Sequence, residues 1–425
     1  MIDSLITTVR SSFEQIRDHR GTNSTYGLVN LLMTGFALFS LKDSSLSHFR
    51  GLYPVRSDNL KRVYGIENLP SDICLREGLD GVNPSDLQSV FKAPIDFLLK
   101  KGVFRSRYVL GDYVAIPFDA TGHYCSNKKG CPQCLVKNHK NGKQTFYHQL
   151  LGAAAVHPTQ STVFPIACEA IVQQDGNQKN DCELNACKRL IPKVREMLPK
   201  EKIIAIFDAL YPNGFHIKEL AQKDMRYIIG IKGQSFVKIQ VERLRESGLL
   251  QSRTWQKDNK TCTASYTNGL ILNGTHLDIQ TNYFEYKEVD NETGEQVFYS
   301  TWITDIPINE ANIEELVAVA RARWKIENET FNTLKNQGYH LEHNYGHGKK
   351  NLATNFALLT FLAFLTDQIA QHMDTFFQKA KAICKTFKAL WERIRAIFYL
   401  IPVKSMKAIY KFICLNKQLN ITPLE

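Results

Sequence analysis

The middle of a long predicted helix reads Arg321-Ala-Arg-Trp-Lys-Ile-Glu-Asn-Glu-Thr-Phe-Asn-Thr-Leu-Lys335. Asn309 or Asn312 can cap its start, and Gly338 can supply the left-handed residue that ends it. Carboxylates are favoured at the positive end of a helix, and the first turns here carry three of them, Glu310, Glu314 and Glu315. The sequence therefore marks both ends of this helix.

One side of the expected helix is apolar and contains a carboxylate. Steps of three and four residues make a seam of Val317, Ala320, Trp324, Phe331 and Leu334. Glu327 falls on this seam, where an acid is costly unless it has a cation or a metal beside it. Arg323 lies one turn earlier on the same side. An i,i+4 ion pair is the simpler interpretation of Glu327, and a metal ligand is the other.

The composition is that of a soluble globular protein with a basic balance. The 425 residues include 53 Lys and Arg against 42 Asp and Glu, an excess of 11 positive charges. Residues 375–417 contain ten Lys or Arg and one acid, Glu392, so nine of the excess charges lie in this tail. A polyanion, usually nucleic acid, is the partner that such an excess favours.

Targeting signals and disulfides are not expected. Met1-Ile-Asp-Ser lacks the basic start and apolar run of a signal peptide. The uncharged stretch 351–366 is short for a membrane span and predicts a buried helix. Ten cysteines in a long chain without such a signal favour reduced thiols or a metal site. We therefore expect a cytoplasmic protein with no membrane partner.

The order of predicted elements indicates an α/β fold. After a helical region at 1–107, which either contacts DNA or covers the core, come three strands, a helix, a strand, a helix and a strand: 113–119, 147–156, 162–172, 181–198, 202–208, 214–222 and 226–232. Alternating residues and Asn-Gly turns then predict an antiparallel β insertion. The expected parts are 1–107, 108–234, the insertion at 235–305, 306–372 with the Glu327 helix, and a helical tail at 373–425.

Three acids are placed where they could share a metal. Asp119 and Asp208 each follow a predicted strand, and Glu327 lies on the helix seam. Carboxylates that converge from separate elements suit hard divalent cations, and two such ions can assist an in-line phosphoryl transfer. Each aspartate taken alone is as readily explained as a turn or cap residue.

Arg323 and Glu327, with Trp324 and Ile326 between them, match part of the Tyr-Arg-Glu-Lys signature of one transposase branch. From about residue 108 to about residue 364 the chain resembles DDE-type transposases of bacterial insertion sequences, which have an RNase H-like core and, in this branch, a β insertion before the Glu helix. Two positions differ from the signature. Ala320 replaces the Tyr and Lys335 comes one residue late, so Glu329 remains an alternative to Glu327.

The resemblance implies catalytic roles for residues of this chain. Asp119, Asp208 and Glu327 would bind Mg²⁺ or Mn²⁺, while Arg323 and Lys335 would hold DNA phosphates. Water would cut the element ends, and the freed 3′ hydroxyl would attack target DNA, with the protein acting as a homodimer on DNA in the bacterial nucleoid. A nuclease that cuts without joining and a catalytically silent DNA-binding descendant are the alternatives.

A Cys/His-rich loop follows the first acid. His123 and Cys125 precede Cys131-Pro-Gln-Cys134 and His139, and the set Cys125, Cys131, Cys134 and His139 is compatible with a structural Zn²⁺. Reduced cysteines in a turn explain the same residues, and His148 is a competing ligand. A second loop contains His340, His343 and His347 at irregular spacing. We expect that loop to be solvated or to face DNA, with Lys349 and Lys350 as contacts.

The basic tail predicts an amphipathic helix from Lys379 to Arg395 and beyond. Charged residues recur at three- and four-residue steps, and apolar residues take a neighbouring face: Ile383, Phe387, Leu390, Ile394 and Ile397. With a single acid on the charged side, we expect the cations to follow DNA phosphates, namely Lys381, Lys385 and Lys388. The alternative is a solvated face packed on the core.

Overall fold

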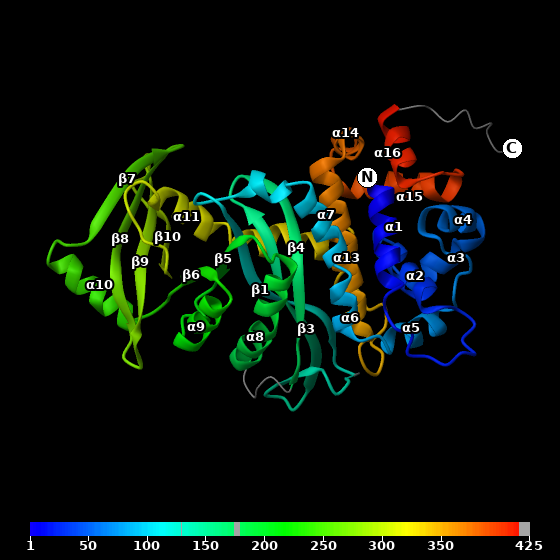
Figure 1. The fold of residues 1–425 in the computed structure, drawn as a ribbon, viewed down its shortest axis with the longest axis horizontal. Helices are drawn as coiled ribbons and strands as arrows, with labels where there is room; N and C mark the ends of the chain where they lie inside the picture. Colours follow the sequence, from blue (N-terminus) through cyan, green and yellow to red (C-terminus); the bar gives the residue numbers. More distant parts are fainter. Residues whose placement is uncertain (129, 174–178, 416–425) are drawn as a thin grey trace.

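The computed structural model describes residues 1–128, 130–173 and 179–415 of the chain, which form an elongated molecule in three parts (Figure 1). A β-rich lobe occupies one end, a sheet covered by helices lies in the centre, and a helical body that contains both the first and the last helix occupies the other end. The fold is mixed α/β, as the sequence predicts.

The described strands form one ten-stranded sheet. Its order is β2-β3-β1-β5-β6-β10-β9-β8-β7, and β4 pairs with β3 off this path. The central strands are β1 (Tyr113–Ser126), β2 (Leu135–Asn138), β3 (Gln144–His157), β4 (Gln160–Ile171), β5 (Lys202–Phe207) and β6 (Met225–Gly230). All seven elements predicted between 113 and 232 are present, with shifted ends.

The middle of the sheet is parallel. Strands β1, β5 and β6 run side by side in the same direction, with Val114 opposite Ile203 and Ile204 opposite Arg226. The inner residues of β5 are all buried and apolar, as expected of a parallel strand covered on both faces. β3 and β4 are antiparallel additions on the other side of β1. The carboxyl end of β5 therefore lies beside the middle of β1, which continues to Ser126.

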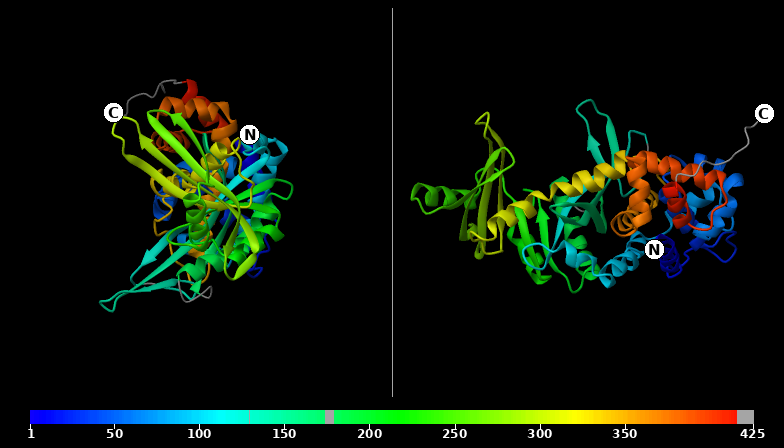
Figure 2. Two further views of the ribbon diagram at one scale, coloured as in Figure 1. Left: turned by 90° about the vertical axis from the view of Figure 1, so that its left-hand side faces the viewer. Right: turned by 90° about the horizontal axis from the view of Figure 1, so that it is seen from above.

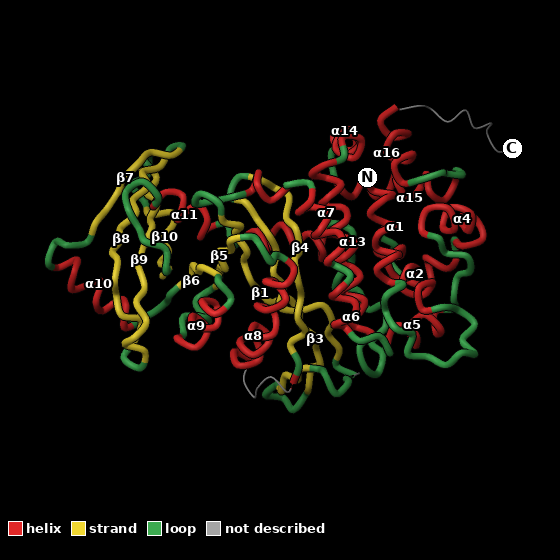
Figure 3. Tube along the Cα trace, viewed as in Figure 1, coloured by secondary structure: helices red, strands yellow, loops and turns green. Residues whose placement is uncertain are grey.

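Helices cover both faces of this sheet (Figure 3). α8 (Lys179–Met197) packs on β3 and β4, and α9 (Gly214–Gln222) packs on β6. The π-helical segment η4 (Ile326–Asn332) crosses β1, β3 and β4, and α13 (Leu352–Met373) lies along β4. Gly152 of β3 faces η4, because a Cβ built there would be 3.2 Å from Cε1 of Phe331.

The helix that carries Glu327 is not continuous, in contrast to the prediction. α11 (Ile313–Arg321) ends in a turn at residues 322–323, η4 follows, and α12 (Thr333–Asn336) completes the run before Gly338, which has φ +99°. The break changes which side faces the core, so Trp324 is 44% exposed and the predicted seam is wrong at this residue. Figure 2 shows the run extending along the long axis of the molecule.

The β-rich lobe contains a helix that the sequence analysis missed. α10 (Phe236–Glu246) begins at Ser235, whose side chain accepts from the amide of Lys238, and it precedes β7 (Gln251–Lys257), β8 (Lys260–Asn273), β9 (His276–Asp290) and β10 (Gln296–Thr304). The expectation of β structure throughout 235–305 was therefore wrong over α10. β10 pairs with both β9 and β6, so the lobe continues the central sheet.

The helical body joins the two ends of the chain. It contains α1 (Ile2–Phe13), α2 (Leu28–Ser40), α3 (Leu46–Gly51), α4 (Tyr53–Asn59), η1 (Leu60–Tyr64), α5 (Asp72–Asp80), α6 (Pro84–Ser89), α7 (Lys92–Lys100) and η2 (Val103–Arg107). It also contains α13, α14 (Thr375–Cys384), α15 (Phe387–Leu400) and α16 (Met406–Leu415). The amide of Asn59 donates to the carbonyls of Phe398 and Ile401, and Asp3 accepts from the backbone of Met406.

α13 is the apolar helix that the sequence predicts to be buried. Among the described residues it is the one helix long and apolar enough to cross a membrane, and its apolar window is entirely buried in the structure. Its start is capped from a distant helix, because Asp80 at the end of α5 accepts from the amides of Lys349, Lys350, Asn351 and Leu352 at 2.9–3.2 Å. α13 is thus the central helix of the helical body.

The basic tail is not a single helix, which corrects the sequence prediction. Lys385 has φ 63° and separates α14 from α15, and Thr386 caps α15 by accepting from the amide of Ala389. Lys381 donates to the carbonyl of Lys385 at 2.8 Å and lies over the ring of Phe387. The expected cationic stripe is therefore broken at Lys385, because that residue leaves the right-handed helical conformation.

Candidate active site

Asp119 lies within β1, and Asp208 follows the carboxyl end of the neighbouring parallel strand β5. The prediction that the first strand ends at Asp119 is wrong, because β1 continues to Ser126 and pairs Asp119 with Gly152 of β3. Pro117 is opposite Ile206 in the register of β1 and β5, so each aspartate is two residues beyond a paired position. The rings of Phe118 and Phe207 stack with centroids 4.6 Å apart just before them. Adjacent parallel strands bring equivalent positions side by side, and the two acids therefore occupy one edge of the sheet.

Glu327 reaches this edge from η4 through a shared arginine. Nη1 of Arg323 is 3.0 Å from Oδ2 of Asp119, and Nη2 is 2.6 Å from Oε1 of Glu327. The i,i+4 pair expected on a regular helix is present, and it extends to a strand 204 residues away. The Glu327 side chain is 48% exposed, so it faces an accessible site and not the core.

The alternative interpretations can be compared with these contacts. Oδ1 of Asp208 accepts from the amide of Leu210 at 2.9 Å, so this residue does cap the turn after β5. Oδ1 of Asp119 accepts from the amide of Ala120 at 2.9 Å. Burial lowers the pKa of Lys325 and the charge of Glu329, the alternative to Glu327, opposes this change. The carboxylate that pairs with Arg323 is that of Glu327. Of the two glutamates, Glu327 is the one that the structure brings to Asp119.

Burial and neighbouring charges shift the pKa values of Asp119 and Arg323. Burial raises the pKa of Asp119 to about 7, the charge of Arg323 opposes this rise, and a hydrogen bond with Glu327 adds to it. Burial lowers the pKa of Arg323, but the charges of Asp119, Glu327 and Asp208 raise it above its ordinary value. One guanidinium therefore faces three acids, and a further cation would be stabilised there.

A cavity opens beside Asp208. It has a volume of about 360 Å³ and lies between the ends of β5, β6 and β10. Asp208 and Arg323 line it together with Lys232 and Lys238, two cations that the sequence analysis did not single out. Both follow the end of β6, and that position next to an acid-bearing strand is the signal that could have identified them. The cavity thus combines an acid with three positive side chains.

The donor set fits a hard divalent cation. All three acids offer carboxylate oxygens, and Asp119 lies between an acid on the neighbouring strand and one within hydrogen-bonding reach. The oxygens are not gathered around one point, because over residues 1–128, 130–173 and 179–415 the group with all ligand atoms within 4.8 Å of one another is a Cys/His cluster. Arg323 occupies the space between Asp119 and Glu327 instead.

The predicted DNA-contacting lysines lie in several places. Lys335 at the end of η4–α12 pairs with Glu342 at 2.8 Å. Lys349 and Lys350 are exposed in the loop before α13. Lys385 and Lys388 are exposed near the α14–α15 junction, while Lys381 is partly covered. The structure does not gather these side chains at the acids, and their role stays a prediction.

The Cys/His residues assemble differently from the predicted set. Cys131 and Cys134 lie with His148 of β3 and with His347 of the loop before α13. Cys125 is exposed, and Nε2 of His139 is 2.8 Å from the hydroxyl of Thr145 at the tip of the β2–β3 hairpin. The predicted ligands Cys125 and His139 are thus outside the cluster, because Cys125 is an exposed residue of β1 and the hairpin carries His139 away. The competing ligand His148 is inside it.

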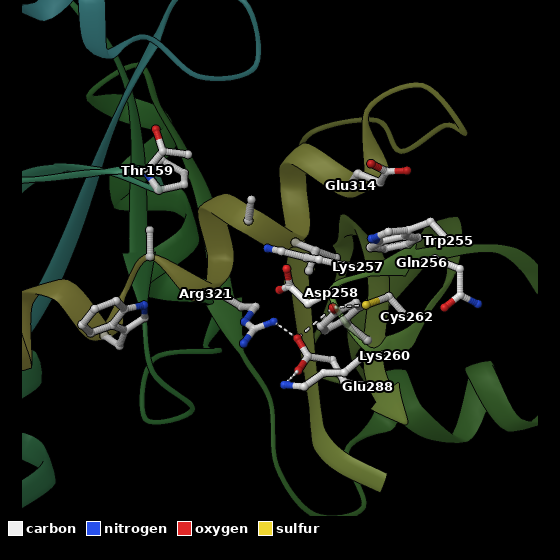
Figure 4. A pocket seen from close by; sticks show the side chains of 16 residues that line it. Thr159, Trp255, Gln256, Lys257, Asp258, Lys260, Cys262, Glu288, Glu314 and Arg321 are labelled. Atoms are coloured by element: carbon white, nitrogen blue, oxygen red, sulfur yellow. Dashed lines mark hydrogen bonds and ion pairs between the residues drawn. The ribbon is translucent and has the colours of Figure 1, made fainter. Parts of the chain in front are cut away.

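A second cavity of about 610 Å³ lies between the β-rich lobe and α11. Figure 4 shows Arg321 pointing toward Glu288 of β9, with Lys260 on the other side of the same carboxylate. Arg253 of β7 also pairs with Glu314, at 2.7 Å. These contacts attach the lobe to the helix that leads to Glu327.

The comparisons with known proteins assign a family to the part of the chain that contains the three acids. Residues 111–365 match the family model described as Transposase DDE domain. A cryo-EM structure of the piggyBac transposase synaptic complex with hairpin DNA is similar over 98% of this chain and 80% of that chain, with 12% sequence identity and a TM-score of 0.40. No curated protein matches the chain. The residues matched by the family model include all three acids.

Proposed function

The chain belongs to the family of transposase DDE domains. We propose that it cuts DNA in an active site formed by Asp119, Asp208 and Glu327, and that it joins the freed ends to target DNA. The observation that supports this assignment best is the guanidinium of Arg323, whose two Nη atoms pair with two different carboxylates. It connects Asp119 with Glu327 on the edge where Asp208 also lies. The substrate would be DNA, and the net charge of +11 favours such a polyanion.

The strand order supports an RNase H-like assignment of the core. Within the large sheet, β4, β3 and β1 are antiparallel neighbours, and β5 and β6 then continue parallel to β1. The first acid lies on the first strand, the second follows β5, and the third comes from a helical segment that crosses the sheet. This is the arrangement expected from the sequence resemblance.

The three acids would hold Mg²⁺ or Mn²⁺. A divalent cation supplies electrostatic stabilisation for in-line displacement at phosphorus. Asp119 is the acid that both neighbours approach, so it would be the shared ligand. Lys232 and Lys238, which line the cavity beside Asp208, would orient the DNA phosphates. A homodimer on DNA would bring two such sites to two element ends.

The reaction can be tested with duplexes that cover the DNA flanking the coding sequence. Incubated with Mg²⁺ or Mn²⁺, the protein should release a 3′ hydroxyl end and join it to a plasmid, and chelation should stop both steps. Asp119→Asn, Asp208→Asn and Glu327→Gln should abolish cleavage and retain DNA binding. Glu329→Gln is the matched control on the same segment and should remain active.

The two alternatives give different outcomes in the same assay. Cleavage without joining, at any metal concentration, would indicate a nuclease. DNA binding without cleavage would indicate a silent descendant. Loss of activity in Glu329→Gln with retention in Glu327→Gln would contradict the assignment of the third acid.

A further inference from the structure

Four side chains from three separate segments meet beside β3. Cys131 and Cys134 belong to the turn before β2, His148 lies within β3, and His347 lies in the loop between α12 and α13. Each contributes one sulfur or nitrogen, and these four atoms lie within 4.8 Å of one another. All except Cys131 are buried. The cluster is separate from the three acids and from the cavity beside Asp208.

The distances within the cluster match a tetrahedron around one ion. The two sulfurs are 3.8 Å apart, the two Nε2 atoms are 3.1 Å apart, and three of the four sulfur–nitrogen distances are 3.3–3.5 Å. The fourth, between Cys131 and His347, is within 4.8 Å. With Zn–S near 2.3 Å and Zn–N near 2.0–2.1 Å, the edges of an ideal site are about 3.8 Å for S···S, about 3.6 Å for S···N and about 3.3 Å for N···N. The five distances from 3.1 to 3.8 Å agree with these edges within a few tenths of an ångström.

Other accounts of the cluster fit less well. A disulfide needs sulfurs about 2.05 Å apart, and these are 3.8 Å apart. Hydrogen bonds among free thiols and imidazoles would explain single pairs, but not four ligand atoms aimed at a common centre. Two sulfurs and two imidazole nitrogens are too soft a set for Mg²⁺ or Ca²⁺ and are typical of tetrahedral zinc.

We propose that Cys131, Cys134, His148 and His347 bind one structural Zn²⁺. The backbone supports this assignment, because the amide of Cys131 donates to the sulfur of Cys134 at 3.4 Å and would stabilise a thiolate. The ring of Tyr124 stacks on His347 with centroids 4.5 Å apart and holds it in place. The site is closed, with four protein ligands, as structural zinc sites are.

The ion fastens the loop after α12 to the strand next to the first acid. His148 lies four residues before Gly152, which pairs with Asp119 and faces Phe331 of η4. His347 lies twenty residues after Glu327. Zinc would thus hold the chain beyond η4 against the strand on which η4 packs, and it would limit movement of the segment that presents Glu327. This positioning effect rests on the proposed function, whereas zinc binding itself does not.

Metal analysis of the full-length protein tests the site directly. Protein purified without chelator should contain one zinc per chain, and Cys131→Ser, Cys134→Ser and His347→Ala should each lose it. Cys125→Ser and His139→Ala are matched controls, since both residues lie in the same region outside the cluster, and each should keep one zinc. Zinc retained in His347→Ala, or lost in either control, would overturn the assignment.

A measurement on the unmodified chain covers the case in which the variants fail to fold. After zinc is exchanged for Co²⁺, the absorption spectrum should show tetrahedral ligand-field bands and thiolate-to-cobalt charge transfer. An octahedral spectrum, or no cobalt uptake, would refute the site. Removal of zinc from the wild type should also increase hydrogen exchange in residues 339–350 at least tenfold. Unchanged exchange there would refute the fastening role, and neither measurement requires DNA or activity.

Discussion

Replacing Asp367 by Asn should destabilise the helical body far more than removal of a surface ion pair. Lys42 follows α2, Asp367 lies on α13, and their side chains form an ion pair that is 1% and 7% exposed. The hydroxyl of Tyr339 donates to Asp367 at 2.7 Å, and Lys42 also lies 3.9 Å from the ring centre of Trp391. The pair therefore joins the N-terminal helices to α13 and α15.

The magnitude follows from burial. Burial lowers the pKa of Lys42 and raises that of Asp367, so each group depends on the other for its charged form. Removing one member of such a pair leaves an uncompensated charge in the interior, which costs about 3–5 kcal/mol. Asp367→Asn keeps an acceptor for Tyr339 and leaves Lys42 unpaired. Lys42→Met/Asp367→Asn should recover part of the loss, because no charge then remains buried.

Urea unfolding followed by fluorescence of Trp391, in a background with Trp255, Trp302 and Trp324 replaced by Phe, reports on this region. Asp112→Asn is the control, since Asp112 pairs with Lys202 at 2.8 Å with both side chains more than half exposed. A pair of that kind is screened by solvent and contributes little to stability. If Asp367→Asn cost no more than the control, or if the double variant were as unstable as the sum of the single ones, the buried pair would be refuted.

Three further changes have expected outcomes. Gly152→Val should lower the free energy of unfolding by about 1–3 kcal/mol, since its side chain would press on Phe331, and an unchanged value in denaturant titration would contradict this packing. Burial lowers the pKa of His216 to about 4 from an ordinary 6.5, so stability should fall as the pH drops below 6.5, by about 2 kcal/mol at pH 5; His216→Phe should remove this dependence in unfolding measured across pH. When Gln replaces Lys381, Lys385 and Lys388, the salt dependence of DNA binding should become shallower by about one unit of slope for each phosphate that the protein no longer neutralises, and an unchanged slope would remove the DNA role.

The parallel strands could be predicted because their signal is local. Buried runs such as 202–207, each followed by an acid, predict Asp119 and Asp208 at strand ends. Asp208 does follow the end of β5, whereas β1 continues past Asp119 to Ser126. The pairing of β1 with β5 then brings the two acids together. Their catalytic role stays a prediction, since geometry alone does not test it.

The run around Glu327 shows where a periodic pattern fails. The prediction carried a 3.6-residue period through the turn at 322–323 and through η4, which placed Trp324 and Glu327 toward the core. A π-helical turn accommodates one residue more than an α-helical turn. The position of this short π-helical segment depends on its packing against the sheet, where Phe331 contacts Gly152.

Contacts between residues that are far apart in the sequence could not be predicted, for a different reason. His347 lies 213 residues from Cys134, and no spacing rule relates them. The same is true of Asp80, which caps α13 from α5. In both cases a turn or helix start acquires its partner only after the chain has folded. Spacing suggested nearer ligands, but Cys125 is an exposed residue of β1 and His139 lies with Thr145 at the tip of the hairpin.

Under the proposed function, the guanidinium of Arg323 can bind either the catalytic carboxylates or a DNA phosphate, but not both at once. In the structure its two Nη atoms bind Asp119 and Glu327, while the same side chain lines the cavity that Lys232 and Lys238 share. A divalent cation would neutralise the carboxylates and weaken both ion pairs, because like charges compete for the same oxygens. The guanidinium would then be available to a phosphate in that cavity, where its fork of donors suits such a group. Cation binding and DNA engagement are therefore expected to reinforce each other, with Arg323 as the residue that exchanges one anion for the other.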